Sequence, residues 1–259
     1  MLRLLKKMRY RLLTEHRLSR YLLYAVGEIT LVVIGILIAL AINNWKEEKA
    51  LAVKEEVYLN GLLNEFAISK KKLEVLISVN QENLEGALTI VKFMSYPDSL
   101  PSEKVISALL IKTFARELSF NPNNSLLLEM VSSGSLKDLS NNDLRKELTN
   151  WLATLEDISK QEQGLAKQRD NVFEVFRTGD FSIRTVFEEL GDSPGSFELP
   201  PGPRQISNLG LLKSVAFENN VLLFVSTCKA TSDNHYLPLM DDLNAIISLI
   251  ENEVKERDR

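Results

Sequence analysis

The sequence contains little of what disulfide, metal or nucleotide chemistry requires. It has one Cys and two His among 259 residues, so it is not a disulfide-stabilised scaffold, and Glu-x-x-His does not occur. P-loop and G-x-G-x-x-G motifs are also missing. With 11 Gly and 8 Pro, the chain is neither collagen-like nor of low complexity. We therefore predict no catalytic residue, no cofactor and no metal site.

Charge is distributed unevenly along the chain. The net charge is −4, yet the first twenty residues hold seven basic side chains and only one acidic one, Glu15. Residues 21–259 therefore hold 31 − 7 = 24 basic and 35 − 1 = 34 acidic residues, a net charge of −10. This polarity favours a membrane protein over a nucleic-acid binder, because phosphate binding needs a larger basic surface. We expect no nucleic-acid partner.

One long apolar run indicates a membrane span. Residues 21–42 contain a single charged side chain, Glu28, and 22 residues of helix reach roughly 33 Å, enough to cross a ~30 Å hydrocarbon core. Tyr21 and Tyr24 at one end and Trp45 at the other are predicted interfacial anchors. We predict a transmembrane helix over residues 21–43, in contact with membrane lipid.

The flanks of this run predict its orientation. Basic residues concentrate before the span, whereas Lys and Glu alternate after it, so the positive-inside rule places residues 1–20 in the cytoplasm and residues 44–259 outside it. Residues 2–13 are either an interfacial helix or a basic tail that sets topology. A cleaved signal peptide ending near Ala39-Leu40-Ala41 is the alternative, although its length exceeds the usual ~15–30 residues.

The rest of the chain predicts an all-α fold. Apolar side chains recur at helical spacing, and strand patterns are nearly absent. We predict that the first helix continues to about residue 95, that Ser102, Ser125, Ser140 and Ser207 begin later helices, and that Pro238 kinks or divides the last one. Residues 191–204 hold four of the eight prolines and predict a surface loop. The lengths favour an antiparallel, four-helix-bundle-like arrangement with coiled-coil-like packing.

Two polar pairs within these helices admit two interpretations each. Glu162 and Arg169 interrupt an otherwise apolar stripe over residues 144–176, so they form a buried pair or ligand site, or mark where the helix leaves the core; we favour the latter. Cys228 and His235 are seven residues apart, about two turns, which favours a buried Cys and an exposed His over a thiolate–imidazole pair. The unpaired Cys228 is also a candidate for linking two chains.

Glu28 requires explanation because a charged carboxylate inside the hydrocarbon costs about 2.5–3.5 kcal/mol. Glu28, Gly35 and Ala39 share one helix face, and Gly35-xxx-Ala39 is a pair of small residues that permits close helix approach. We expect this face to bind a second copy or another membrane protein. The alternatives are that Glu28 bonds Tyr24 or extends to the headgroups.

Residues 27–29 (GEI), 33–40 (VIGILIAL) and 42–45 (INNW), together with residues 126–148 and the basic tail, resemble a family of uncharacterised single-pass membrane proteins of Gram-negative bacteria. The resemblance extends over the whole chain. It implies an inner-membrane location and a periplasmic domain, and it supplies no activity and no catalytic residues.

These observations favour a non-enzymatic, membrane-anchored binding, scaffold or accessory protein of the cell envelope. A sensor or relay component is the alternative; with a tail of twenty residues it would act through a partner's membrane helix. An envelope enzyme is the least favoured, since it would need an acid–base cluster assembled from distant residues.

Overall fold

The computed structural model describes residues 17–96, 98, 100–191, 199–200, 202 and 204–257, with the backbone alone at 17–21, 23 and 24. All regular structure in these residues is helical, which confirms the predicted all-α class. The chain divides into two compact units, Met1–Glu56 and Val57–Arg259. The predicted tail helix at residues 2–13 lies outside the described part of the chain.

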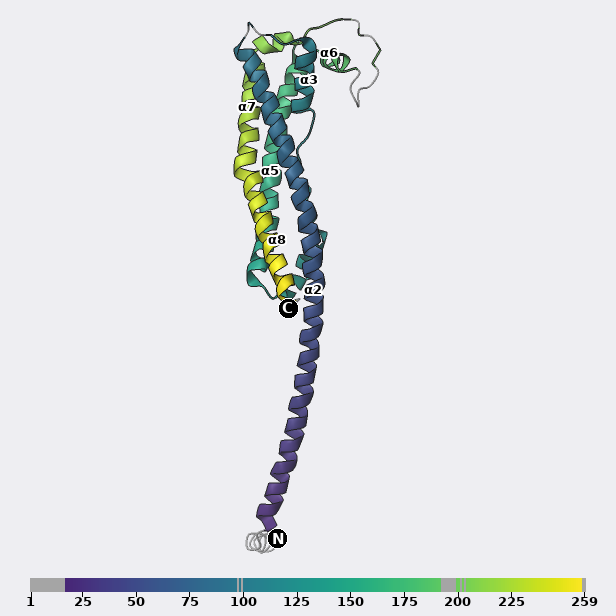
Figure 1. Cartoon of the computed structure of the whole chain (residues 1–259), viewed down its shortest axis with the longest axis vertical. Coiled ribbons are helices and arrows are strands. Elements are labelled where there is room, and N and C mark those ends of the chain that lie inside the picture. The colour runs from purple at the N-terminus through teal and green to yellow at the C-terminus, as the bar shows by residue number, and fades with distance from the viewer. Residues whose placement is uncertain are drawn as a thin grey trace, which may run out of the picture. The chain divides into compact units, whose positions relative to one another are not determined.

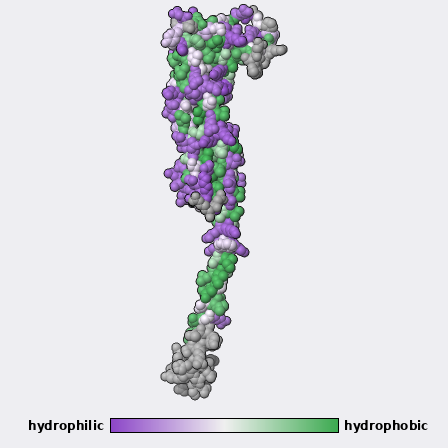
Figure 2. All heavy atoms as spheres, viewed as in Figure 1, coloured by the Kyte–Doolittle hydropathy of each residue, from purple (hydrophilic) through white to green (hydrophobic). Residues whose placement is uncertain are grey.

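The first unit contains the start of one long helix, α2 (Arg17–Ser95). Apolar side chains from Val26 to Ile42 are exposed around its circumference, and Figure 2 shows the resulting hydrophobic surface. Among the described residues, α2 is the one helix long and apolar enough to cross a membrane. It ends where the sequence predicted, beside Tyr96-Pro97.

The second unit combines residues 57–95 of α2 with the helices that follow (Figure 1). Their bounds are α3 (Glu103–Phe114), α4 (Ser125–Ser132), α5 (Asn142–Thr178), α6 (Ile183–Glu189), α7 (Val215–Thr231) and α8 (Leu237–Arg257). Within this unit α2 and α5 run in one direction and α7 and α8 run in the opposite one. The predicted antiparallel path is thus confirmed for the long helices.

The return leg between α2 and α5 is not a continuous helix. The sequence predicted α3 to extend to about residue 118, but it ends at Phe114. Residues 117–124 lack helical structure, and α4 begins only at Ser125. The run Asn121-Pro122-Asn123-Asn124 keeps the chain non-helical just before α4, since Pro lacks an N–H and Asn favours turns. The bundle therefore has three long helical columns and one interrupted leg.

Two hydrophobic clusters form the core of the bundle. One joins Leu59 and Phe66 of α2 to Trp151 of α5 and Ile250 of α8. The other joins Ala87 and Ile90 of α2 to residues of α3, α5 and α7, among them Phe114, Val172, Phe217 and Phe224. Buried polar side chains include Asn80 of α2 and Glu162 of α5, the two helices that contribute to both clusters, and Thr231 at the end of α7.

Of the four serines predicted to cap helices, only Ser102 is an N-cap at the predicted position. Ser102 accepts a hydrogen bond from the Val105 N–H, as predicted for an N-cap. The cap of α5 is Asn141 rather than Ser140, because the Asn141 carboxamide accepts from the Leu144 N–H. The last helical stretch begins at Val215 with Ser214 as its cap, so the prediction of Ser207 was wrong.

The N-terminus of α4 is capped from another helix. Ser125 is its first helical residue and Asn124 makes no side-chain cap bond, so Ser125 is not the cap that the sequence predicted. Instead the carboxylate of Glu65 on α2 accepts from the Leu126 N–H at 2.8 Å and from the Leu127 N–H at 3.4 Å. This contact fastens α4 to α2.

Pro238 does not break the last helical column. A π-helical turn, Ser232–Tyr236, joins α7 directly to α8, and the Leu237 N–H donates to the Ser232 carbonyl five residues earlier. The π-helical turn ends two residues before Pro238, which has no N–H to donate. The irregular part of the helix therefore lies where the sequence predicted a kink.

Two glycines allow α2 to approach its neighbours closely. A Cβ at Gly86 would lie 2.1 Å from Thr113 Oγ1 of α3, and one at Gly61 would lie 2.4 Å from Leu126 Cδ2 of α4. The interrupted leg is therefore held against α2 at both of its helices. Of the predicted loop at 191–204, residues 192–198, 201 and 203 lie outside the described residues.

Candidate functional site

The predicted interaction face on the first unit is exposed. Glu28, Gly35 and Ala39 all lie on the solvent-exposed surface of α2, and a Cβ built on Gly35 meets nothing within 4 Å. Thr30 donates its hydroxyl hydrogen bond to the Val26 carbonyl, within the same helix. The face is thus open to another helix, and whether one binds there stays a prediction.

The aromatic anchors are described in part. Trp45 is 59% exposed, and the Lys49 ammonium lies 5.3 Å from its ring centroid, a cation–π contact. The amphipathic indole beside a cation suits a membrane–water interface. The side chains of Tyr21 and Tyr24 lie outside the described structure, and with them the alternative bond between Glu28 and Tyr24.

A buried polar centre joins three parts of the second unit. Glu162 Oε1 on α5 accepts from the Tyr236 hydroxyl at 2.8 Å and from the Phe120 N–H at 2.8 Å. Glu162 is 7% exposed and Tyr236 is fully buried. The interpretation that Glu162 marks the helix leaving the core is therefore wrong. Its carboxylate binds uncharged donors from the interrupted leg and the π-helical turn.

Burial determines the ionisation of this pair. Removal from water raises the pKa of the Glu162 carboxyl above its ordinary value, while the bonds from Tyr236 and Phe120 oppose the shift. Burial, reinforced by the adjacent carboxylate, raises the pKa of Tyr236 well above its ordinary value. Tyr236 is therefore a fixed hydrogen-bond donor at physiological pH.

Two further hydrogen bonds between polar groups join α7 to its neighbouring helices. Asn80 Nδ2 on α2 donates to the Cys228 carbonyl at 3.0 Å, and Gln161 Nε2 donates to Thr231 Oγ1 at 2.9 Å. These bonds join α2 to α7 and α5 to α7. Together with the Glu162 centre they form the polar layer, which we define as Asn80, Gln161, Glu162, Thr231 and Tyr236.

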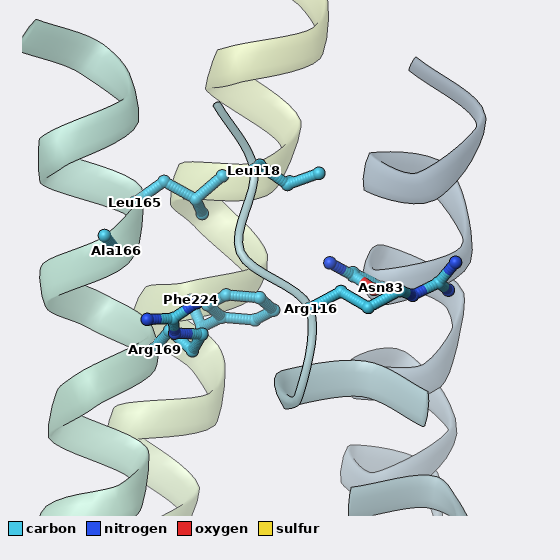
Figure 3. A pocket seen from close by; sticks show the side chains of 7 residues that line it. All are labelled: Asn83, Arg116, Leu118, Leu165, Ala166, Arg169 and Phe224. Carbon is cyan, nitrogen blue, oxygen red and sulfur yellow. The ribbon is translucent and has the colours of Figure 1, made fainter. Parts of the chain in front are cut away.

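A small cleft opens beside Arg116 and Arg169. Figure 3 shows Arg169 of α5 and Phe224 of α7 pointing toward the segment after α3, from which Arg116 extends toward Asn83 of α2. Its cavity volume is ≈ 10 Å³, room for about one water.

Acidic neighbours balance both arginines. Arg116 pairs with Glu82 at 2.6 Å, which lowers the pKa of that carboxyl. Arg169, whose side chain is 16% exposed, lies 3.9 Å from Glu117 and 3.4 Å from Asp170. The cleft, with room for about one water, therefore lacks the volume that a bound anion would require.

Cys228 and His235 are not brought together as a reactive pair. Cys228 is fully buried on α7, and burial raises the pKa of its thiol to about 12. Burial of the thiol disfavours an interchain link through Cys228. His235 lies half-buried in the π-helical turn.

Comparison with known proteins assigns the chain to a family. A family of unknown function (DUF6090) matches residues 28–167, more than half of the 259 residues. The chain belongs to this family. The match begins at Glu28 in the apolar run and ends on α5 beyond Glu162. No curated protein and no solved structure matches the chain significantly.

The sequence revealed some of these features and concealed others. Glu162 stood out because it interrupts an apolar stripe, yet its partners lie 42 and 74 residues away. Glu65 carried no comparable signal, because its position beside the α4 N-terminus depends on how the helices pack. Among the described residues, no group of three His, Cys, Asp or Glu side chains is placed to hold a metal ion.

Proposed function

We propose that this DUF6090 protein is a non-enzymatic, single-pass protein of the bacterial inner membrane that presents its helical bundle to the periplasm and binds another membrane helix. The observation that carries the proposal is the apolar surface of α2, which is exposed from Val26 to Ile42 and contains one carboxylate, Glu28. Such a surface requires lipid or a partner helix around it.

The partner surface in this proposal is the face of Glu28, Gly35 and Ala39. Seven residues are close to two helical turns, so the three positions stack along one side of α2. Small side chains at 35 and 39 allow a partner's backbone to approach, and a hydrogen-bond donor from the partner lowers the cost of placing Glu28 in hydrocarbon.

The proposal is tested by cross-linking in living cells, followed by affinity purification and mass spectrometry of wild type and Glu28→Leu. We expect one membrane protein, another copy or a different chain, to be recovered with wild type and lost with the variant. Equal recovery of that membrane protein with wild type and with Glu28→Leu would show that Glu28 does not contribute to the interaction.

Two matched substitutions isolate the face from general effects on insertion. Ala39→Leu adds bulk on the Glu28 side, whereas Ala41→Leu adds the same bulk two residues, about 200°, further round the helix. We expect Ala39→Leu to reduce the cross-linked product at least fivefold and Ala41→Leu to leave it unchanged. Equal effects of the two variants would contradict the assigned face.

A relay role through a partner's membrane helix is the second candidate, and the polar layer favours it. Hydrogen bonds join α2 and α5 to α7 where apolar packing would otherwise dominate, and a further bond joins α5 to the π-helical turn. Such turns are frequent at functional sites. An enzyme is less favoured, since the perturbed pair Glu162–Tyr236 lines neither the Arg116 cleft nor the groove described below.

A further inference from the structure

An apolar groove lies where α3, α5 and α6 meet in the second unit. Its volume is ≈ 370 Å³, within the range of small-molecule sites. Phe173 and Phe176 come from the end of α5 and Phe187 from α6, while Ile111 and Ala115 form the α3 side. None of the three phenylalanines is fully buried, so the groove presents aromatic surface to the outside.

The walls of the groove are fixed by contacts behind it. Phe173 packs edge-on against Phe114, and Phe176 against Phe181, with ring centroids 6.4 and 6.5 Å apart. The Ser182 N–H donates to Asn208 Oδ1 at 2.8 Å, and the Thr185 hydroxyl donates to the Ile206 carbonyl at 2.7 Å. These bonds hold α6 in place, so a ligand would find the groove already formed.

One charged side chain lines the groove. Arg177, at the end of α5, donates to Glu174 at 3.0 Å, and both side chains are more than half exposed. An exposed pair of this kind is weak, and a guanidinium has five N–H donors, so Arg177 can bind a further carboxylate. The groove thus combines an apolar body with a single cationic position.

We propose that this groove binds a free monocarboxylate of the fatty-acid type. The aliphatic tail would lie against Phe173, Phe176 and Phe187, and the carboxylate would accept charge-assisted hydrogen bonds from Arg177. A single cation matches one negative charge, which favours a monoanion over a polyanion. This site is independent of the membrane-helix face.

Decanoate is the probe for this inference. The full chain in phosphatidylcholine nanodiscs is titrated with carboxyl-¹³C decanoate by NMR, with empty nanodiscs as the reference for partitioning into lipid. We expect saturable binding of one decanoate per chain, and the same affinity in nanodiscs that contain phosphatidylglycerol. The proposal would be overturned if the decanoate signal in excess of that from empty nanodiscs did not saturate. It would also be overturned if binding required phosphatidylglycerol.

Variants distinguish the head group from the tail. We expect Arg177→Gln to weaken decanoate binding about tenfold or more and to leave decanol binding unchanged, because only the carboxylate uses the charge. Arg184→Gln, an arginine on α6 that does not line the groove, should bind decanoate as wild type does. Equal decanoate affinity in Arg177→Gln and wild type would contradict the assignment.

Filling the groove gives a second test that removes no core side chain. Ala115→Trp places an indole in the groove, whereas Ala216→Trp adds the same group on the exposed surface of α7. We expect decanoate binding to be lost in Ala115→Trp and retained in Ala216→Trp, with unchanged thermal unfolding in both. Wild-type affinity in a folded Ala115→Trp variant would place the ligand elsewhere.

Discussion

At the scale of single residues, the polar layer replaces apolar packing with hydrogen bonds. Glu162 is the clearest case, because its carboxylate is buried yet receives no cation, only the Tyr236 hydroxyl and the Phe120 N–H. A buried carboxylate with neutral donors costs stability when it is ionised. The compensation is specificity, since these two bonds fix the interrupted leg and the π-helical turn against α5.

The raised pKa of Glu162 predicts how its contribution depends on pH. A carboxyl whose pKa is higher in the folded than in the unfolded chain stabilises the fold below the unfolded value, near 4.5, and loses that contribution as pH rises through the folded value. Glu162→Gln should therefore gain stability relative to wild type between about pH 4 and pH 7, by about 1.4 kcal/mol for each unit of raised pKa.

Unfolding of the full chain in nanodiscs, followed by Trp151 fluorescence in a Trp45→Phe background, measures this difference. Glu156→Gln is the matched control on the same helix, because Lys160 lowers the pKa of Glu156 and the trend should have the opposite sign. A pH-independent difference for Glu162→Gln would contradict the account of the polar layer.

Tyr236 supplies one of the two donors to Glu162. Tyr236→Phe removes the hydroxyl and leaves the buried carboxylate with the Phe120 N–H alone. We expect a loss of about 1–3 kcal/mol in the free energy of unfolding at pH 7, and a smaller loss at pH 4 where the carboxyl is protonated. Equal losses at both pH values would show that the ionised form of Glu162 is not what Tyr236 stabilises.

At the scale of elements, α2 determines where the interrupted leg can lie. Gly86 and Gly61 allow close approach to α3 and α4, and Glu65 caps α4. The sequence predicted α2, α5 and the last column from their periodicity, because those helices bury one regular stripe each. It misplaced the end of α3 and the cap of α4, since both depend on contacts with a helix more than 25 residues away.

Gly86 provides a test at this scale. Gly86→Ala places a methyl group against Thr113 Oγ1, so we expect the free energy of unfolding to fall by about 1–3 kcal/mol. Gly164→Ala on α5 adds the same group where nothing lies within 4 Å and should stabilise the helix by about 0.5–1 kcal/mol. Chemical unfolding of both variants measures the difference, and a stabilised Gly86→Ala variant would contradict the close approach.

The Glu65 cap gives a second test. Glu65→Gln keeps an acceptor but loses the negative charge at the α4 N-terminus, so we expect a loss of about 0.5–2 kcal/mol. Hydrogen exchange should accelerate most at the amides of Leu126 and Leu127, which donate to Glu65. Uniform acceleration over the whole bundle would mean that the cap does not act locally.

At the scale of the whole molecule, the chain joins an apolar helical surface to a packed helical bundle. Its all-α class followed from the sequence because apolar periodicity is strong and strand patterns are scarce. The polar layer and the groove beside α6 did not, because each is assembled from residues far apart in sequence. The face of Glu28, Gly35 and Ala39, by contrast, was predicted from composition and spacing alone. Its binding to another membrane helix stays a prediction.

The central claim is that residues 21–43 cross the membrane and place the bundle on the far side from the basic tail. Labelling intact cells, with a permeabilised outer membrane, by a maleimide that cannot cross the inner membrane tests it directly. The native chain is the blank, because Cys228 is buried. Val75→Cys, at a position 64% exposed, should be labelled before lysis and Ser19→Cys only after it. Labelling of Ser19→Cys before lysis, or of Val75→Cys only after it, would contradict the claim.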